Sequence, residues 1–228
     1  MSGDDTARLL VAAASAVLLD FDGPVGEVFA GYPSGRVADD VRRVIHAAGM
    51  RFLDDLADTQ DPLTVLRLVA QRRPDLTGAV DDALTIAELH ASCMSRPTAG
   101  ARAFLVACRT ARRPVVIVSN NSAACVRAYL ARHDLVGHVT AVLGRPRHRP
   151  DLMKPHPGLV EAALARVRVE PARAVLIGDS VTDVEVALAC RVPVIGLANK
   201  PGKRDRLAAA GAEVIIEAMT ELVVPEAV

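Results

Sequence analysis

The chain has 228 residues, of which 51% are hydrophobic, and its 27 basic residues balance its 27 acidic residues. This length and composition allow a large hydrophobic core and exclude a disordered chain. The formal net charge is zero and no aromatic residues interleave with the arginines, which argues against nucleic-acid binding. The four cysteines are widely spaced, so we expect no zinc site and no disulfide framework, but buried free thiols in a reducing compartment.

The apolar run Leu9–Leu19 is too short to cross a membrane, and it leads directly into Asp20. Acidic residues, Asp4 and Asp5, precede this run, which argues against a signal peptide. We therefore interpret the run as the end of a helix followed by a strand, and expect a cytoplasmic protein without membrane association.

The first strand is expected at about Ala16–Asp20, because a short continuous apolar run is typical of a strand buried on both faces. Glycines and prolines in residues 23–35 predict an irregular excursion. Helical spacing of apolar residues then predicts three helices between Val37 and about Leu89, the second of which begins after an N-cap at Asp61. This insertion of roughly sixty residues is longer than a strand crossover requires, and no strand is expected in it.

Strands and helices alternate through the rest of the chain, after a helix near Ala99–Ala111. The alternation is typical of right-handed crossovers and a mostly parallel sheet. The strands are expected at Pro114–Ser119, Val139–Leu143, Ala174–Gly178, Val192–Leu197 and Glu213–Ile216, and the helices at Ala123–Arg132, Gly158–Arg168, Val181–Cys190 and Arg204–Ala210.

Two aspartates follow the first predicted strand, in the motif Asp20-Phe21-Asp22-Gly23. Ligands of open α/β sheets bind at the carboxyl ends of the strands, so carboxylates placed there can attack phosphorus or hold a metal. The alternative is an ordinary turn, because Asp and Gly both favour turns.

Polar residues also stand in two of the loops between predicted strands and helices. The run Ser119–Ser122 closes the strand that begins at Pro114, and its hydroxyl and amide groups can bind an anion or simply cap the next helix. Lys154 precedes Pro155, which keeps the lysine out of helical conformation and can direct its ammonium inward; the alternative is a surface lysine.

A second pair of aspartates, Asp179 and Asp183, follows the strand Ala174–Gly178. If a helix starts near Ser180, both carboxylates face the same side and suit Mg²⁺, although an N-cap followed by a first-turn aspartate gives the same pattern. The basic run Arg145–Arg149 is expected to be a solvated loop, with contact to an anionic substrate or partner as the alternative.

Taken in order, the motifs Asp-x-Asp-Gly, Ser, Lys-Pro and Gly-Asp-x-x-x-Asp resemble those of the haloacid dehalogenase (HAD) superfamily of hydrolases, over about residues 15–217. The sequence is most similar to the phosphoglycolate phosphatase-like members with a helical C1-type cap after the first motif. The resemblance implies an α/β fold, with a Rossmann-like, mostly parallel core formed by residues 1–24 and 97–228 and an inserted helical cap formed by residues 25–96.

The resemblance also implies roles for individual residues. Asp20 is implied to be the nucleophile that forms an aspartyl-phosphate, Asp22 the general acid and base, and Lys154 the cation that neutralises the nucleophile and the phosphate. The residues implied to bind the substrate phosphate are Ser119, Asn120 and, through its backbone amide, Phe21. The implied Mg²⁺ ligands are Asp20, the backbone carbonyl of Asp22, Asp179 and Asp183, the last as a ligand or a supporting residue.

The function implied is that of a Mg²⁺-dependent phosphatase acting on a small phosphorylated metabolite. A phosphomutase of the same superfamily and a non-catalytic phospholigand-binding protein are the alternatives. Asp22 favours phosphoryl chemistry, because the dehalogenase branch lacks this second aspartate. Pro24 stands where the family commonly has Thr, yet the Phe21 and Asp22 amides are retained and we expect activity to survive. We expect a monomer or homodimer that binds a phosphate ester, with neither nucleic-acid nor membrane partners.

Overall fold

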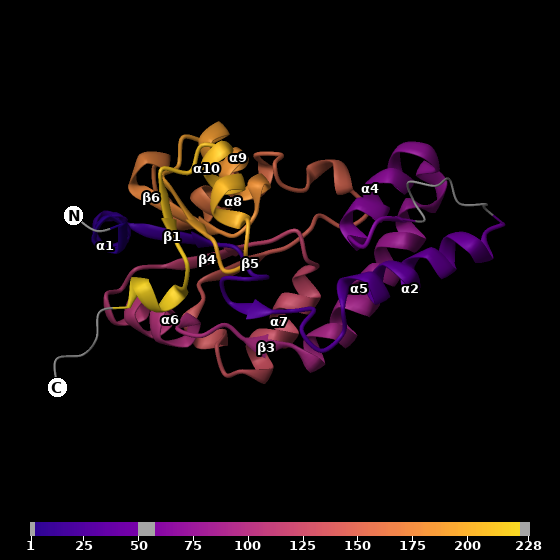
Figure 1. Cartoon of the computed structure of the whole chain (residues 1–228), viewed down its shortest axis with the longest axis horizontal. Helices are drawn as coiled ribbons and strands as arrows, with labels where there is room; N and C mark the ends of the chain where they lie inside the picture. The colour runs from indigo at the N-terminus through magenta and orange to yellow at the C-terminus, as the bar shows by residue number, and fades with distance from the viewer. Residues whose placement is uncertain (1–2, 50–57, 224–228) are drawn as a thin grey trace.

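The computed structural model describes residues 3–49 and 58–223. A sheet flanked by helices lies at one end of the molecule and a group of helices at the other (Figure 1). The sheet has six parallel strands in the order β5-β4-β1-β6-β7-β8. These strands are β1 (Ala16–Leu19), β4 (Val115–Val118), β5 (Ala141–Leu143), β6 (Ala174–Gly178), β7 (Val194–Leu197) and β8 (Val214–Ile216). The predicted parallel α/β core is therefore confirmed, with strand ends shifted by one or two residues.

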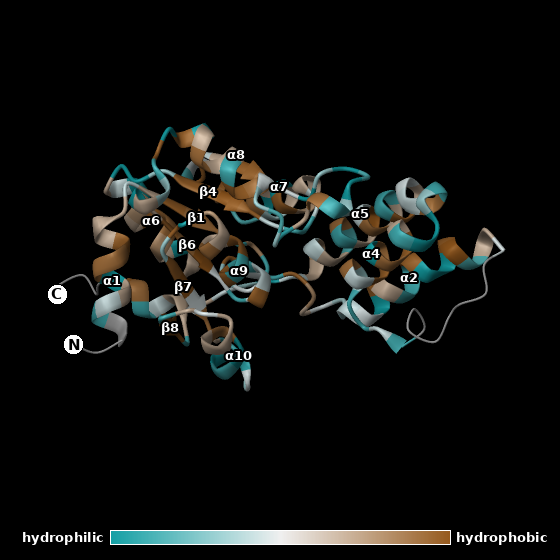
Figure 2. Ribbon diagram, turned by 90° about the horizontal axis from the view of Figure 1, so that it is seen from above, coloured by the Kyte–Doolittle hydropathy of each residue, from teal (hydrophilic) through white to brown (hydrophobic). Residues whose placement is uncertain are grey.

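Alternate side chains of each strand face two different helical layers, because a strand has a side-chain period of two residues. Val17 and Leu19 of β1 belong to the hydrophobic cluster on one face, and Leu18 belongs to the cluster on the other. Figure 2 shows the apolar strands enclosed between these layers. One layer contains α1 (Gly3–Ala13), α6 (Ala101–Thr110) and α7 (Ala123–Arg132), and the other contains α8 (Gly158–Val167), α9 (Val181–Ala189) and α10 (Lys203–Ala209).

The inserted helices have a hydrophobic cluster of their own, to which Val41, Val65 and Leu84 belong. These helices are α2 (Ser34–Ala47), α4 (Pro62–Arg72) and α5 (Thr77–Met94). The predicted N-cap at Asp61 is confirmed, since its side chain accepts hydrogen bonds from the amides of Leu63 at 3.0 Å and Thr64 at 3.2 Å. The three predicted helices are present, and α5 is longer than its apolar spacing predicted.

A short antiparallel ribbon connects the two parts of the molecule. It consists of β2 (Gly26–Glu27) and β3 (Arg96–Pro97). Both strands lie outside the stretch from Val37 to Leu89, in which no strand was expected. The sequence did not predict them, because strands of two residues are too short to show an alternating pattern. Helix α5 also connects the two parts: Leu84 belongs to the cluster of the inserted helices, whereas Ala91 belongs to a cluster beside the sheet.

The expectation of buried free thiols is confirmed for two of the four cysteines, and Cys190 is half-buried. Cys108 and Cys125 are buried free thiols as expected, but Cys93, near the end of α5, is exposed.

Within the described ranges, no helix combines the length and the apolar character that a membrane crossing requires.

Candidate active site

Loops that follow different strands meet at the carboxyl edge of the sheet. Asp20 follows β1, Ser119 follows β4 and Asp179 follows β6, while Lys154 lies in the segment after β5. Because β1 is central in the strand order, Asp20 is placed between the other two strand ends. These residues line a cavity of about 920 Å³ that also contacts the inserted helices. The predicted site residues in its lining are Asp20, Asp22, Ser119, Asn120, Lys154 and Asp179.

The ammonium of Lys154 is fully engaged inside the protein. The residue is 2% exposed, and its Nζ donates to Asp20 Oδ1 at 2.8 Å, to Asp183 Oδ1 at 2.6 Å and to the Val118 carbonyl at 2.8 Å. A lysine ammonium has three donors, so each finds an acceptor here. Asn120 fixes the main chain of Lys154 from both sides, because its Oδ1 accepts from the Lys154 amide at 2.8 Å and its Nδ2 donates to the Lys154 carbonyl at 3.2 Å. The inward direction predicted for this lysine is therefore confirmed.

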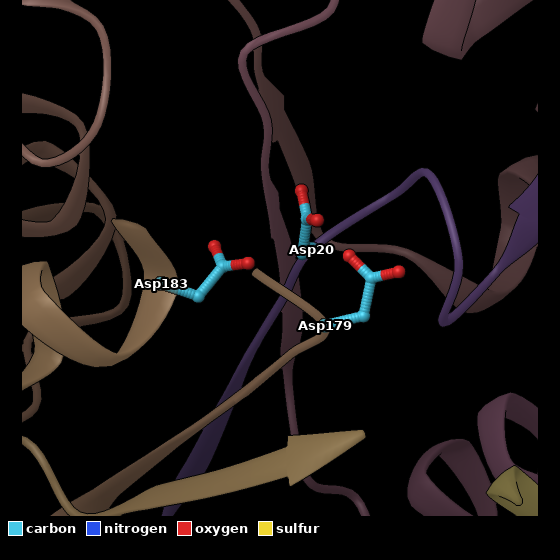
Figure 3. A group of neighbouring side chains, drawn as sticks. All are labelled: Asp20, Asp179 and Asp183. Carbon is cyan, nitrogen blue, oxygen red and sulfur yellow. The ribbon is translucent and has the colours of Figure 1, made fainter. Parts of the chain in front are cut away.

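Three carboxylates lie together beside this lysine (Figure 3). One oxygen from each of Asp20, Asp179 and Asp183 lies within 4.8 Å of the other two. Asp183 is completely buried, and its second oxygen accepts from the Ser180 amide at 3.1 Å and hydroxyl at 2.6 Å, in a capping box at the start of α9. Asp183 is thus both a helix-capping residue and a neighbour of the other two carboxylates, and it does not line the cavity.

The three carboxyl groups of this cluster outnumber the two lysines that pair with them, Lys154 and Lys203. Burial, and then the charge of Asp183, raise the pKa of Asp20 to about 8, although Lys154 acts in the opposite direction. Burial also raises the pKa of Asp179, against the effect of its ion pair with Lys203. In Lys154, burial acts to lower the pKa, but Asp183 and Asp20 outweigh it and raise the pKa. Clustered carboxylate oxygens with unbalanced charge suit a hard divalent cation such as Mg²⁺, so the residues present fit the metal that the family motifs imply.

The turn after β1 places the second aspartate of the first motif. Asp22 Oδ1 accepts from the Val28 amide at 2.9 Å, and burial raises the pKa of Asp22 to about 6. A carboxyl group with such a pKa can donate and accept protons near neutral pH. Gly23 has φ +105°, and a side chain on it would collide with Asp179, so only glycine fits this position. The Thr98 hydroxyl donates to the Gly23 carbonyl at 2.6 Å and holds this turn next to Pro24.

Phe21 is buried and does not line the cavity. Its ring lies 5.0 Å from that of Tyr129, edge to face. The side chain therefore anchors the turn in the core and is not available to a ligand. Its implied part in phosphate binding stays a prediction.

The expectation of a solvated loop at Arg145–Arg149 was wrong for its first residue. Arg145 is 5% exposed and forms ion pairs with Asp81 and Glu88 of α5, whereas Arg147 is exposed as expected. The signal that identified the other site residues was available for Arg145 too, because it follows β5 after a single glycine.

Other polar residues that the motifs did not identify also line the cavity. Asn199 and Lys200 follow β7 after a single alanine, so the position near a strand end would have indicated them. Arg67 comes from α4 and donates to the Lys154 carbonyl at 2.9 Å. Its helical position carries no comparable signal, because a charged residue on an amphipathic helix is ordinarily solvated.

The family model of the haloacid dehalogenase-like hydrolases matches residues 10–191 of this chain. No protein in a search of curated sequences matches this chain. Among solved structures, a HAD family hydrolase from Deinococcus radiodurans R1, with bound phosphate and sodium, is 27% identical, with a TM-score of 0.62 over 92% of this chain and 94% of that chain. CbbY from Rhodobacter sphaeroides, in complex with phosphate, is 18% identical, with a TM-score of 0.69 over 92% and 96%. A putative β-phosphoglucomutase from Thermotoga maritima is 19% identical, with a TM-score of 0.61 over 91% of this chain and 96% of that chain.

Proposed function

The chain belongs to the haloacid dehalogenase-like hydrolase family, as its motifs indicated, and from this premise we propose that it is a Mg²⁺-dependent phosphatase of a small phosphorylated metabolite. One observation carries the proposal: the Lys154 ammonium lies 2.8 Å from Asp20 at the wall of a cavity that Asp22, Ser119 and Asp179 also line. The proposed nucleophile Asp20, proton carrier Asp22 and cation Lys154 all line the cavity that a phosphate ester would enter, which supports the proposal.

In the first step an oxygen of Asp20 forms a bond to phosphorus while the bond from phosphorus to the ester oxygen breaks. Asp22 gives its proton to the departing ester oxygen, which leaves as an alcohol. In the second step Asp22 takes a proton from water as the water oxygen attacks the phosphorus of the aspartyl-phosphate. The bond to Asp20 breaks, and inorganic phosphate leaves with Asp20 restored.

The remaining residues stabilise charge and position the phosphoryl group. Lys154 offsets the repulsion between the anionic nucleophile and the anionic substrate, and the Ser119 hydroxyl and Asn120 hold phosphoryl oxygens. The backbone amide of Phe21 is proposed to donate to the same oxygens.

The metal ligands proposed are Asp20 and Asp179 through their carboxylates and Asp22 through its carbonyl. Asp183 is a supporting residue, because Lys154 and Ser180 already occupy its oxygens. When bound, Mg²⁺ would add positive charge beside the transferring phosphoryl oxygens.

Residues 25–96 are proposed to act as a cap over the core formed by residues 1–24 and 97–228. Ser34, Thr59 and Arg67 of this segment line the same cavity as Asp20. A cap in this position excludes water and contacts the part of the substrate that does not react, so it sets specificity.

The test is turnover of a chromogenic phosphate ester and of a panel of phosphorylated metabolites, with Mg²⁺ and with a chelator. We expect chelator-sensitive phosphate release, loss of turnover in Asp20→Asn, and an aspartyl-phosphate trapped on Asp20 in the wild type. Asp151→Asn is the control, because this aspartate is exposed and pairs only with Arg149 in the described structure. Absence of turnover with every ester, together with no trapped intermediate, would overturn the proposal in favour of a binding protein.

A phosphomutase is the second candidate, and the putative β-phosphoglucomutase with the same fold supports keeping it. A mutase transfers the phosphoryl group from the aspartyl-phosphate back to a sugar hydroxyl, whereas a phosphatase transfers it to water. A sugar phosphate that is isomerised without release of inorganic phosphate would identify the mutase.

A further inference from the structure

A buried ionic cluster connects helix α5 to the core, outside the candidate active site. It consists of Arg145, Asp81 and Glu88, and we call it the Arg145 cluster. Arg145 Nε lies 2.6 Å from Asp81 Oδ1, and its Nη1 lies 2.9 Å from Glu88 Oε1. The side chains are 1%, 3% and 0% exposed, respectively. Asp81 and Glu88 lie two helical turns apart on one face of α5, so one arginine reaches both.

The cluster contacts the main chain of the loop that follows β4. Arg145 Nη1 donates to the Asn120 carbonyl at 2.8 Å, and the Arg145 amide donates to the Asn121 carbonyl at 2.8 Å. Glu88 Oε2 accepts from the Ser122 amide at 2.9 Å, at the start of α7. The loop that carries Ser119 and Asn120 is therefore held by Arg145 and by Glu88 together.

From this loop the contacts continue to the nucleophile. Asn120 binds the amide and the carbonyl of Lys154, and Lys154 Nζ donates to Asp20. A continuous series of hydrogen bonds thus leads from Glu88 and Arg145, through Asn120 and Lys154, to Asp20.

We infer that Arg145 and Glu88 are positioning residues. Through them, helix α5 fixes the loop that carries Ser119 and Asn120, and with it Lys154, in position beside Asp20. This inference rests on the proposed function and deepens it, because it assigns the geometry of the phosphate site to a helix that the sequence places in the cap.

A purely structural role would not require these charges. Desolvation of three charged groups is costly, and apolar side chains of similar size often give equal or greater stability. A second ion pair, Arg147 with Asp82 at 3.1 Å, already connects α5 to the segment after β5 that carries Arg145, and it is exposed to solvent. Of these two sets of ion pairs, the Arg145 cluster is the one that contacts Asn120. The property that distinguishes it is therefore its contact with the loop that carries Ser119 and Asn120.

The test compares Asp81→Asn/Glu88→Gln/Arg145→Met with the matched control Asp82→Asn/Arg147→Met. The first variant removes all three buried charges together, which avoids an unpaired one, and its amide oxygens still accept from the Ser122 and His148 amides. The control removes the exposed pair between the same two segments. Kinetics on the best ester, inorganic phosphate affinity by calorimetry and the Tm are measured for wild type and both variants.

For the buried-cluster variant we expect kcat to fall about 10- to 100-fold with KM changed less than about threefold. The reason is that displacement of catalytic groups by about 1 Å lowers the reaction rate by factors of this order. Phosphate affinity is expected to fall about three- to tenfold, and the control is expected to match the wild type. A buried-cluster variant that folds and keeps wild-type kcat and phosphate affinity would overturn the inference. If that variant does not fold, Arg145→Lys, which keeps the charge but not the planar guanidinium, is measured in its place. Unchanged kcat and phosphate affinity in Arg145→Lys would likewise overturn the inference.

Failure of the proposed function gives a different result. A wild type that binds phosphate but hydrolyses no ester contradicts the phosphatase, while the phosphate affinities still test the positioning. A wild type with neither activity nor phosphate binding contradicts both.

Discussion

The Nζ atom of Lys154 lies 2.8 Å from Oδ1 of Asp20, although 134 positions separate the two residues in the chain. The same ammonium also donates to Asp183 and to the Val118 carbonyl, so residues from four separate segments meet at one cation. An ammonium with all three donors satisfied in a buried site is fixed in position, which suits the role proposed for Lys154 beside Asp20.

Lys154→Met is expected to lower kcat/KM about 100- to 1000-fold, because the variant removes the charge that offsets repulsion between Asp20 and an anionic substrate. Lys154→Arg is expected to restore little, since the planar guanidinium cannot replace an ammonium among three acceptors. Steady-state kinetics on correctly folded protein, verified by circular dichroism, test this. Retention of more than a tenth of wild-type activity in Lys154→Met would contradict the assigned role.

Asp20→Asn is expected to stabilise the protein at pH 8 in the presence of a chelator. The pKa of Asp20 is raised from 3.8 to about 8 in the folded state, so ionisation of this carboxyl opposes folding. Its contribution to stability therefore falls as the pH rises from about 4 to about 8. We expect the Tm of Asp20→Asn to exceed that of wild type by about 5 °C at pH 8 and by much less at pH 5.

Thermal melts at the two pH values measure this difference. Asp151→Asn is again the control, because Arg149 lowers the pKa of this exposed carboxyl and no stabilisation is expected on its replacement. An equal Tm for wild type and Asp20→Asn at pH 8 would show that the three carboxylates are compensated in some other way.

Saturating Mg²⁺ is expected to raise the Tm of the metal-free protein by about 5–10 °C, since a ligand that binds only the folded state stabilises it according to its affinity. Asp179→Asn is expected to lose most of this increase, because Asp179 is a cavity-lining member of the carboxylate cluster. Differential scanning calorimetry with a sodium salt of equal ionic strength separates binding from screening. An identical response to the sodium salt would exclude a divalent site.

Cys93 is expected to react with a colorimetric thiol reagent in the native protein, whereas Cys108 and Cys125 are expected to react only after denaturation. Burial raises the pKa of the Cys108 and Cys125 thiols and also excludes the reagent. Cys93→Ser should remove the fast phase of the reaction. Rapid modification of Cys125 in the native protein would show that the core beside α7 opens readily.

Local sequence patterns predicted the strands, because a short continuous apolar run is removed from water on both faces only when the strand lies between two helical layers. The positions of Asp20, Ser119 and Asp179 followed from the same reasoning, since parallel strands bring their carboxyl ends to one edge. The ribbon of β2 and β3 was not predictable, because two residues carry no periodic signal.

The parallel α/β core, the helical insertion and the residue types that meet at the sheet edge could be predicted from the amino-acid sequence, because each depends on a chemical preference expressed over a few neighbouring residues. Two features became apparent in the folded protein alone: Arg145 is buried against Glu88, and Asp183 accepts a hydrogen bond from Lys154 without lining the cavity. Burial of a charged residue depends on partners that are distant in the chain: 57 positions separate Arg145 from Glu88, and 29 separate Lys154 from Asp183. No local pattern encodes such a distance, so these contacts emerge only when the strands and α5 have packed.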